Sequence, residues 1–227
     1  MEATSPADDI GFSLDAAQIR VLGVLIEKSF ITPDIYPMSI NALLTGSNQL
    51  TAREPVMNLS EQEVQQAIDG LVALRLVARR DQAGARVAKY EHLVRLRHSL
   101  PPPEQAVLAM LMLRGPQTAG ELRQRCERLH RFDDVAAVEA VLEHLGEKYP
   151  PLASALPRAP GTKEARHLHL LGGQAAVDEA VEAAQTQAGG GGGGRGRIAE
   201  LESEVAQLRA EVDTLRAEFE RFRQQFD

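Results

Sequence analysis

Aromatic residues are scarce in this sequence, which contains no tryptophan and in which aromatic side chains make up 4% of 227 residues. A core built mainly from Leu, Val, Ile and Ala fits small helix-rich domains better than a large β-sandwich. Apolar residues still form 44% of the chain, which is enough for one or two cores, and the length exceeds that of one typical domain. The composition therefore predicts two compact units.

Cysteine and long apolar runs are also nearly absent. Cys126 is the only cysteine, which excludes an intrachain disulfide or a cysteine-based zinc site and is typical of a reducing cytoplasm. The longest apolar runs, from Val21 and Ala106, are far shorter than the roughly 20 residues that cross a bilayer. Residues 1–13 are acidic and lack the apolar core of a signal peptide. We therefore expect a disordered tail there and a cytoplasmic protein without a membrane segment.

No strong enzyme motif occurs: GxSxG, a phosphate-cradling glycine loop, HExxH and CxxC are all missing. His167 and His169 alternate onto one face of an expected strand, and Glu127 with His130 forms a single ExxH pair. A zinc site needs three or four converging ligands, and neither pair has an evident partner in the sequence. We expect no catalytic residue, no metal and no cofactor, and a protein that is not an enzyme.

Positive charge is in short supply, since the formal net charge is −7. Residues 1–13 carry −3 and residues 173–227 carry −5, whereas residues 14–172 carry +1. A nearly neutral globular region does not attract nucleic acid strongly through its overall charge. Composition alone therefore does not predict nucleic-acid binding.

Residues 14–98 contain three helix signals followed by two strand signals. Apolar residues at helical spacing predict a first helix that starts at Ser13 or Asp15, and Ser39 is suited to cap a second. In the third, SEQE from Ser60 has the spacing of a capping box. The apolar face of this helix consists of Val64, Ile68, Leu71 and Val72.

Strand-like runs begin at Leu76 and Arg86, on either side of Gly84 as the turn residue. Three helices followed by a hairpin are the order of a winged-helix domain. In that fold the third helix enters the major groove of DNA and the hairpin tip contacts phosphate.

The outward residues of the third helix and the hairpin leave two interpretations open. If the helix entered the major groove, its carboxylates would approach the DNA phosphates, beside glutamines that are able to read adenine edges. These residues are Glu61, Glu63, Gln65, Gln66 and Asp69. Basic residues lie on the preceding loop and on the hairpin: Arg53, Arg79, Arg80, Arg86 and Lys89. They contact nucleic acid or a partner, or they make surface ion pairs worth about 0 to 1 kcal/mol each.

The segment Asn48–Leu59 is longer than the tight turn that usually connects the second and third helices of this fold. One interpretation is a structural brace, in which Arg53 or Glu54 ties the segment to the first helix. The partner there would be Glu27 or Lys28. The other interpretation is a contact surface. We favour the brace for Glu54 and leave Arg53 open, because a guanidinium binds either a carboxylate or a phosphate.

The same order of signals recurs in residues 101–172, which argues for duplication of one module. A helix is predicted over Ala106–Leu113, and TAGE from Thr118 is a second capping box. The apolar face of the third helix consists of Val135, Val138, Val141, Leu142 and Leu145. Strand-like runs, LASAL and EARHLHLL, begin at Leu152 and Glu164.

Basic residues gather on the second helix and the hairpin of this repeat. The helix carries Arg123, Arg125, Arg128 and Arg131, and the hairpin carries Arg158, Lys163 and Arg166. The third helix is again acidic outward, at Asp133, Asp134, Glu139 and Glu143. If DNA is bound, we expect the basic residues to hold phosphate with little reading of bases. The alternative is a solvated helix face.

Two stretches, EKSFITPDIYPMSINALLTGSNQLTAREPVMNL from Glu27 and LMLRGPQTAGELRQR from Leu111, resemble the pattern of the YceH-like family of bacterial proteins. The resemblance covers nearly all of Leu14–Leu171 and implies two tandem winged-helix domains. The chain has Ser47 and Leu50 where the family pattern usually has Cys and Lys.

After Leu171 the sequence changes character. Residues 173–197 contain an Ala- and Glu-rich stretch and then the glycine run Gly189–Gly194, which predicts a flexible linker. Residues 198–227 have the heptad spacing of a coiled coil. The residues on its apolar seam are Ile198, Leu201, Val205, Leu208, Val212, Leu215, Phe219 and Phe222, followed by Phe226.

Charges beside this seam favour a parallel homodimer. In a parallel pair each g position meets the following e position of the partner chain, and all these pairs are opposite in sign. They are Arg197 with Glu202, Glu204 with Arg209, Glu211 with Arg216, and Glu218 with Arg223. The alternative, a helix that folds back on its own domains, does not explain this pattern.

The sequence therefore predicts a mainly α protein with small β-hairpins, an α+β class. Two tandem winged-helix domains, 14–98 and 101–172, precede a coiled-coil helix at 198–227. The first functional hypothesis is a DNA-binding or transcription-associated homodimer. The alternative is a protein–protein interaction module that retains the winged-helix shape without DNA binding and uses Asn48–Leu59 against another protein. The acidic third helices favour this alternative.

Deletion of residues 198–227 tests the dimer. We expect the full chain to have twice the mass of a monomer and the truncated chain to be monomeric, because the seam and its charge pairs are removed together. Light scattering of both proteins measures this. An unchanged number of subunits after the deletion would rule out dimerisation through the coiled coil.

Overall fold

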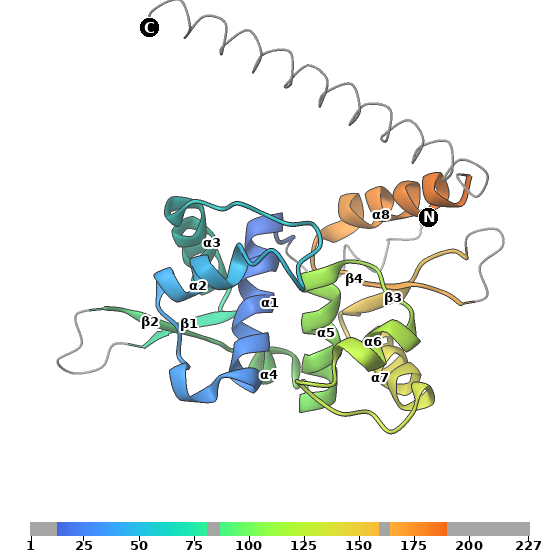
Figure 1. The fold of residues 1–227 in the computed structure, drawn as a ribbon, viewed down its shortest axis with the longest axis horizontal. Helices are drawn as coiled ribbons and strands as arrows, with labels where there is room; N and C mark the ends of the chain where they lie inside the picture. The colour runs from blue at the N-terminus through green and yellow to red at the C-terminus, as the bar shows by residue number, and fades with distance from the viewer. Residues whose placement is uncertain (1–12, 81–86, 159–163, 190–227) are drawn as a thin grey trace, which may run out of the picture. The chain divides into compact units, whose positions relative to one another are not determined.

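The computed structural model describes residues 13–80, 87–158 and 164–189 (Figure 1). Over these residues the protein is mainly helical and carries two small antiparallel hairpins, which confirms the predicted α+β class at this level. Several predicted features lie outside the described residues: residues 1–12 of the tail predicted at 1–13, the candidates Arg86 and Lys163, and the residues of the glycine run and coiled coil beyond Gly189.

The first repeat consists of three helices and a hairpin. In chain order these are α1 (Ala16–Ile31), the 3-10 turn η2 (Pro33–Ile35), α2 (Ile40–Ser47), α3 (Glu61–Ala73), β1 (Val77–Arg80) and β2 (Lys89–His92). The strands pair antiparallel, with Val77 opposite His92 and Arg80 opposite Lys89. A short helix that was not predicted, α4 (Val94–His98), follows the hairpin.

Local side-chain caps determine where these helices begin. Asp15, not Ser13, caps α1, because its carboxylate accepts a hydrogen bond from the backbone N–H of Gln18 at 2.8 Å. The predicted capping box of α3 is confirmed. Ser60 Oγ accepts from the N–H of Glu63 at 3.3 Å, and the Glu63 carboxylate accepts from the N–H of Ser60 at 2.7 Å.

The second repeat has the same order of elements. It consists of α5 (Pro102–Arg114), α6 (Ala119–Arg125), α7 (Val135–Glu147), β3 (Ala153–Ala155) and β4 (His167–His169), and α8 (Gly173–Gly189) follows it. Thr118 and Glu121 form the predicted capping box of α6. The two strands pair antiparallel, and both are shorter than the strand-like runs in the sequence.

Each repeat joins its hairpin to its helices through one further pair of backbone hydrogen bonds. In the first repeat Met38, between α1 and α2, pairs with Tyr90 of β2 at 3.0 and 2.8 Å. In the second repeat Gln117, between α5 and α6, pairs with His167 of β4 at 3.0 and 2.7 Å. The two repeats therefore share this connection as well as the order of their elements.

The first helices of the two repeats, α1 and α5, lie side by side (Figure 1). Their approach is close at Gly23, where an added Cβ would lie 3.1 Å from the Leu113 side chain. Buried residues of both repeats form one continuous hydrophobic core within the compact unit Met1–Val181. The predicted domain boundaries, 14–98 and 101–172, stay a prediction.

Two valines correct the predicted apolar faces. Val72 is 37% exposed and Val135 is 38% exposed, although both were expected to be buried. Val72 follows the fully buried Leu71 and lies about 100° round the helix from it, at the edge of the buried face of α3, and Val135 is the first residue of α7. Within the described part of the chain, no helix is both long enough and apolar enough to cross a bilayer.

Candidate functional site

The segment Asn48–Leu59, here called the 48–59 loop, connects α2 to α3 and is closed on itself. The Asn48 side-chain amide donates to the carbonyl of Leu59 and accepts from its N–H, both at 2.8 Å. The backbone N–H of Glu54 donates to the carbonyl of Leu113 on α5, also at 2.8 Å. The loop is therefore attached to the second repeat as well as to its own.

Arg20 of α1 binds the backbone at the start of this loop and within it. Its side chain donates to the carbonyl of Ser47 at 3.0 Å and to that of Pro55 at 2.6 Å, and the residue is only 2% exposed. Burial, together with the nearby charge of Arg53, lowers the pKa of Arg20 to about 10. The guanidinium is still protonated at neutral pH. Sequence reasoning missed this residue, although a charge inside the apolar run of a helix is a signal of its role.

Arg53 is the second anchor and is 5% exposed. Its guanidinium donates to both carboxylate oxygens of Glu27, at 3.1 and 2.6 Å, and to the carbonyl of Gly46 at 3.0 Å. Such a bidentate pair suits an arginine better than a lysine. The brace therefore involves Arg53, which the sequence had left open. The Glu54 side chain, which was favoured for that role, belongs to an exposed residue.

The ion pair controls the protonation of Glu27. Burial by itself would raise the pKa of Glu27, but the hydrogen bonds and charge of Arg53, and then Lys28 at 3.3 Å, lower it below its ordinary value of 4.5. The carboxylate is therefore ionised at neutral pH, and the pair stabilises the folded state under those conditions.

The loop presents apolar side chains on this fixed backbone. Leu50 is 80% exposed and Val56 is 54% exposed, and Glu54 and Pro55 between them are exposed as well. Single exposed apolar residues are common on protein surfaces. These two differ because several buried hydrogen bonds hold the loop that carries them. Sequence reasoning noted Leu50 only as a departure from a family pattern.

The basic candidates of the first hairpin are partly engaged within the chain. Nε of Arg80 donates to the Glu91 carboxylate at 2.8 Å, while the Arg80 side chain stays 58% exposed. Arg79 is exposed, and Lys89 is half-buried. The hairpin therefore presents both arginines to solvent, and Arg80 pairs with a carboxylate.

The outward face of α3 is acidic. Gln65 donates to the Asp69 carboxylate at 2.9 Å, and Gln66 is exposed. Glu61 and Glu63 are exposed in the first turn, where negative charge stabilises the N-terminus of the helix. Both glutamines therefore lie beside carboxylates that would repel a phosphate backbone.

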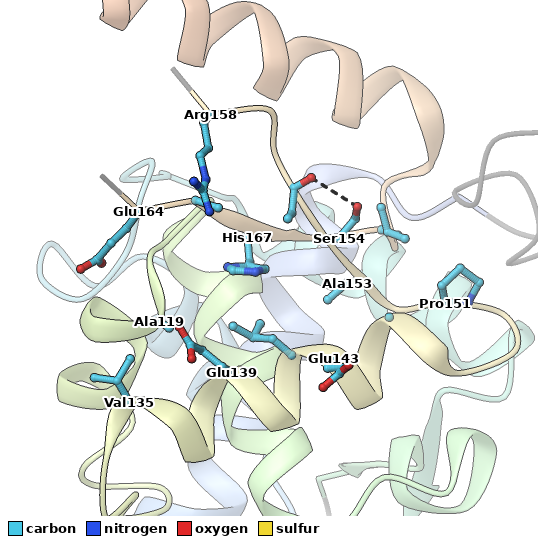
Figure 2. Close-up of a pocket in the computed structure, with 15 residues that line it drawn as sticks. Ala119, Val135, Glu139, Glu143, Pro151, Ala153, Ser154, Arg158, Glu164 and His167 are labelled. Carbon is cyan, nitrogen blue, oxygen red and sulfur yellow. Dashed lines mark hydrogen bonds between the residues drawn. The ribbon is translucent and has the colours of Figure 1, made fainter. Parts of the chain in front are cut away.

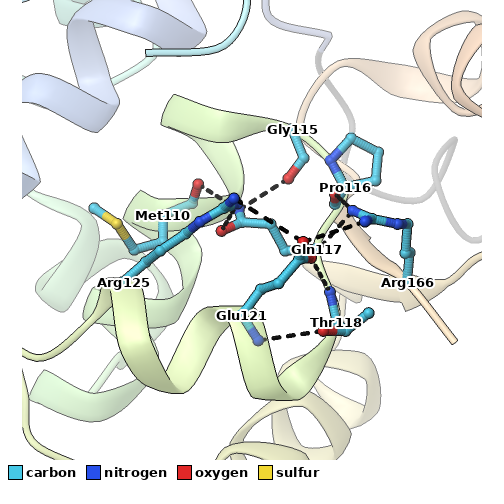
Figure 3. Close-up of polar contacts among 8 residues, drawn as sticks. All are labelled: Met110, Gly115, Pro116, Gln117, Thr118, Glu121, Arg125 and Arg166. Carbon is cyan, nitrogen blue, oxygen red and sulfur yellow. Dashed lines mark hydrogen bonds and ion pairs between the residues drawn. The ribbon is translucent and has the colours of Figure 1, made fainter. Parts of the chain in front are cut away.

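In the second repeat, arginines brace the turn between α5 and α6 (Figure 3). Gln117 is fully buried, and its side-chain oxygen accepts from Arg125 at 2.8 Å. Arg166 donates to the carbonyl of Pro116 at 2.7 Å and pairs with Glu121 at 3.1 Å. Two members of the predicted basic set thus stabilise the fold around one buried glutamine.

Of the other basic candidates in this repeat, some bind groups of the chain itself and others are exposed. Arg123 donates to the backbone carbonyl of Asp133 at 2.8 Å, which ties α6 to the start of α7. Arg131 lies 3.8 Å from the Glu127 carboxylate in an exposed pair. Arg128 and Arg158 are exposed. Helix α6 ends at Arg125, so Arg128 and Arg131 lie beyond it and not on the helix to which the sequence assigned them.

The ranges described contain no preformed metal site, and their one cysteine is not an activated thiol. No three His, Cys, Asp or Glu side chains there lie close enough to hold a metal ion. Cys126 is buried, which raises the pKa of its thiol to about 12, so the thiol is protonated and a poor nucleophile. Burial lowers the pKa of His169 to about 4, so this imidazole is neutral at physiological pH.

Comparison with known proteins identifies relatives along most of the chain. A family model described as "Protein of unknown function, DUF480" matches residues 14–162. UPF0502 protein azo0627 of Azoarcus sp. (strain BH72) is 72% identical over 205 residues, which cover 90% of each chain. UPF0502 protein HEAR1280 of Herminiimonas arsenicoxydans is 52% identical over 192 residues, which cover 84% of this chain and 81% of the relative. The YceH-like name stays a prediction.

Replacement of Arg53 by Met tests the anchor. Among the described residues, the change leaves the buried Glu27 with Lys28 as its remaining ion partner, and we expect the free energy of unfolding at neutral pH to fall by about 3 kcal/mol or more. The pKa of Glu27 in the folded protein lies below its ordinary value, so the loss is complete above pH 4.5 and shrinks as the pH falls below it. Urea denaturation followed by circular dichroism measures both effects.

Two control proteins make this test specific. Arg80→Met removes an arginine from an exposed ion pair, and we expect no measurable loss of stability. Arg53→Met combined with Glu27→Leu removes the buried carboxylate that has lost its arginine and should recover most of the lost stability. Equal losses for Arg53→Met and Arg80→Met would show that the buried pair has no special role.

Proposed function

This chain belongs to the protein family DUF480, and from its structure we propose that it is a protein–protein interaction module that keeps a tandem winged-helix shape. It acts in the cytoplasm without enzymatic activity and presents the 48–59 loop to another protein. The observation that carries the proposal is the combination of a loop fixed by the buried arginines Arg20 and Arg53 with the exposed apolar side chains of Leu50 and Val56.

The repeated order of elements supports the winged-helix part of this proposal. Each repeat has three helices and then a hairpin, the order of the fold. Each also links the segment after its first helix to the second strand of the hairpin, at Met38 in one repeat and Gln117 in the other. One residue of that segment thereby bridges to the edge of each two-stranded sheet, beside the helices.

The electrostatics of the third helices argue against groove binding as the main activity. The outward face of α3 carries Glu61 and Asp69, and that of α7 carries Glu139 and Glu143. Each would lie near phosphates if its helix entered the major groove, and like charges at close range cost free energy. Several arginines that could offset this repulsion are engaged inside the chain, Arg53 most completely.

The loop suits a partner protein because it is already ordered before binding. A fixed loop loses little conformational entropy on association, so more of the contact energy appears as affinity. Leu50 and Val56 supply apolar contact area, and Glu54 lies between them in the sequence. A complementary partner surface would have an apolar recess with basic residues at its rim.

Site-specific photocrosslinking tests the loop. We place a benzophenone amino acid at position 50 or, as a control, at Tyr149, which is 91% exposed in the segment between α7 and β3 of the second repeat. In cells of the source organism, the benzophenone at position 50 should form a discrete crosslinked adduct with a partner protein. The benzophenone at position 149 should not form this adduct. To test Leu50→Asp and Val56→Asp, the benzophenone is moved to Thr51. Each substitution should reduce the yield of the adduct at least about tenfold, because it puts a charge into an apolar contact.

These substitutions affect exposed side chains, so we expect the free energy of unfolding to change by no more than about 0.5 kcal/mol. Circular dichroism and thermal denaturation check that the fold is kept. The absence of a position-specific adduct, or an adduct that survives both substitutions, would contradict the proposal.

Binding of duplex DNA by a homodimer is the second candidate function. Arg128 and Arg158 favour it, because both are exposed in the repeat whose helices and hairpin follow the winged-helix order. A parallel coiled coil over residues 198–227 would bring the two repeats of each chain together in one dimer. The weak phosphate contacts of all four repeats would then add up to a higher affinity. This arrangement would hold DNA mainly through its backbone.

A salt titration against random duplex DNA separates the two candidates. If the chain is an interaction module, we expect no saturable binding even at low salt. Saturable binding that weakens steeply with salt would favour the second candidate, because displaced counterions give a slope of about −0.9 for each phosphate contact. In that case the combined replacement of Arg80, Arg86, Arg123 and Arg128 by Ala should lower both the affinity and the slope. Fluorescence anisotropy measures both quantities.

A further inference from the structure

The second repeat contains a cavity of about 730 Å³ between α7 and the β3–β4 hairpin (Figure 2). This size falls within the roughly 300–1,000 Å³ of small-molecule sites. Helix α7 forms one wall, and the hairpin with the residues at its ends forms the other. Apolar side chains line part of it, among them Val135, Leu142, Ala153 and Leu170.

The cavity is negatively charged. Glu139 and Glu143 lie one turn apart on α7, so their side chains project from the same face of the helix, and Glu164 lies on the hairpin side. Among the described residues of the lining, Arg158 is the one basic side chain that is charged at neutral pH. Three carboxylates against one guanidinium give these described residues a net charge of −2.

His167 adds a hydrogen-bonding group without adding positive charge. Its ring lies over α7 (Figure 2), and Nδ1 is buried with no hydrogen-bond partner among the described residues. Burial lowers the pKa of His167, against a smaller opposing effect of Glu139. A neutral imidazole therefore leaves the negative charge of the cavity in place.

We propose that this cavity binds a linear aliphatic polyamine. Its ammonium groups would pair with Glu139, Glu143 and Glu164, and its methylene chain would lie along the apolar side chains between them. One lysine side chain of a protein partner carries a single cation and leaves the other carboxylates unpaired. A ligand with several cations on a short apolar chain matches both features of the lining.

This site is distinct from the 48–59 loop, so it does not depend on the function proposed for the loop. We expect a moderate affinity for the polyamine, because the carboxylates are exposed and salt cations compete with the polyamine for them.

Calorimetric titration of the full chain with spermidine at low salt tests the inference. We expect one saturable site whose affinity falls about fivefold when Glu139 and Glu143 are both replaced by Gln, since each exposed pair contributes modestly. The matched control replaces Glu127 and Glu147 by Gln. That protein loses the same charge from the same repeat, but neither residue lines the cavity, so its affinity should be unchanged. Ala155→Trp, which places a bulky side chain at a lining position without a change of charge, should abolish binding.

Three outcomes would overturn the inference. The first is no saturable binding of spermidine. The second is an equal loss of affinity in the two double variants, which would show nonspecific attraction to an acidic protein. The third is tighter binding of a trilysine peptide than of spermidine, which would assign the cavity to a basic protein segment. Thermal denaturation of each variant confirms that it is folded.

Discussion

The buried pair of Arg53 and Glu27 is the interaction on which the arrangement of the first repeat depends. It joins the 48–59 loop to α1 and, through the carbonyl of Gly46, to the end of α2. Burial of two charges costs free energy that only close geometry and further hydrogen bonds offset. Because the guanidinium meets both carboxylate oxygens, the loop has one favourable position and its backbone is held there.

Several arginines of this chain act as internal braces, so fewer basic residues are available for binding at the surface. Arg125 and Arg166 stabilise the turn around the buried Gln117, and Arg123 ties α6 to the start of α7. A guanidinium that already donates to carbonyls and carboxylates has fewer donors left for phosphate. The count of arginines therefore overstates how much positive surface the folded protein presents.

The two repeats have similar frameworks but expose different features. In the first, the long connection between α2 and α3 carries exposed apolar side chains on a braced backbone. In the second, the space between α7 and its hairpin is open and acidic. A duplicated module can diverge in this way, because loops and helix surfaces tolerate changes that the shared core between α1 and α5 does not.

The sequence by itself determined the features that depend on near neighbours. The capping boxes at Ser60 and Thr118 were predictable because their partners stand three residues away, and the order of helices and hairpins followed from local periodicity. Tertiary structure decided the rest. The partner of Arg53 is 26 residues away and Arg20 reaches Pro55 across 35 residues, so only the packing of α1 against the loop brings them together. The cavity beside α7 likewise has walls from separate elements, and no periodicity in the chain encodes the space between them.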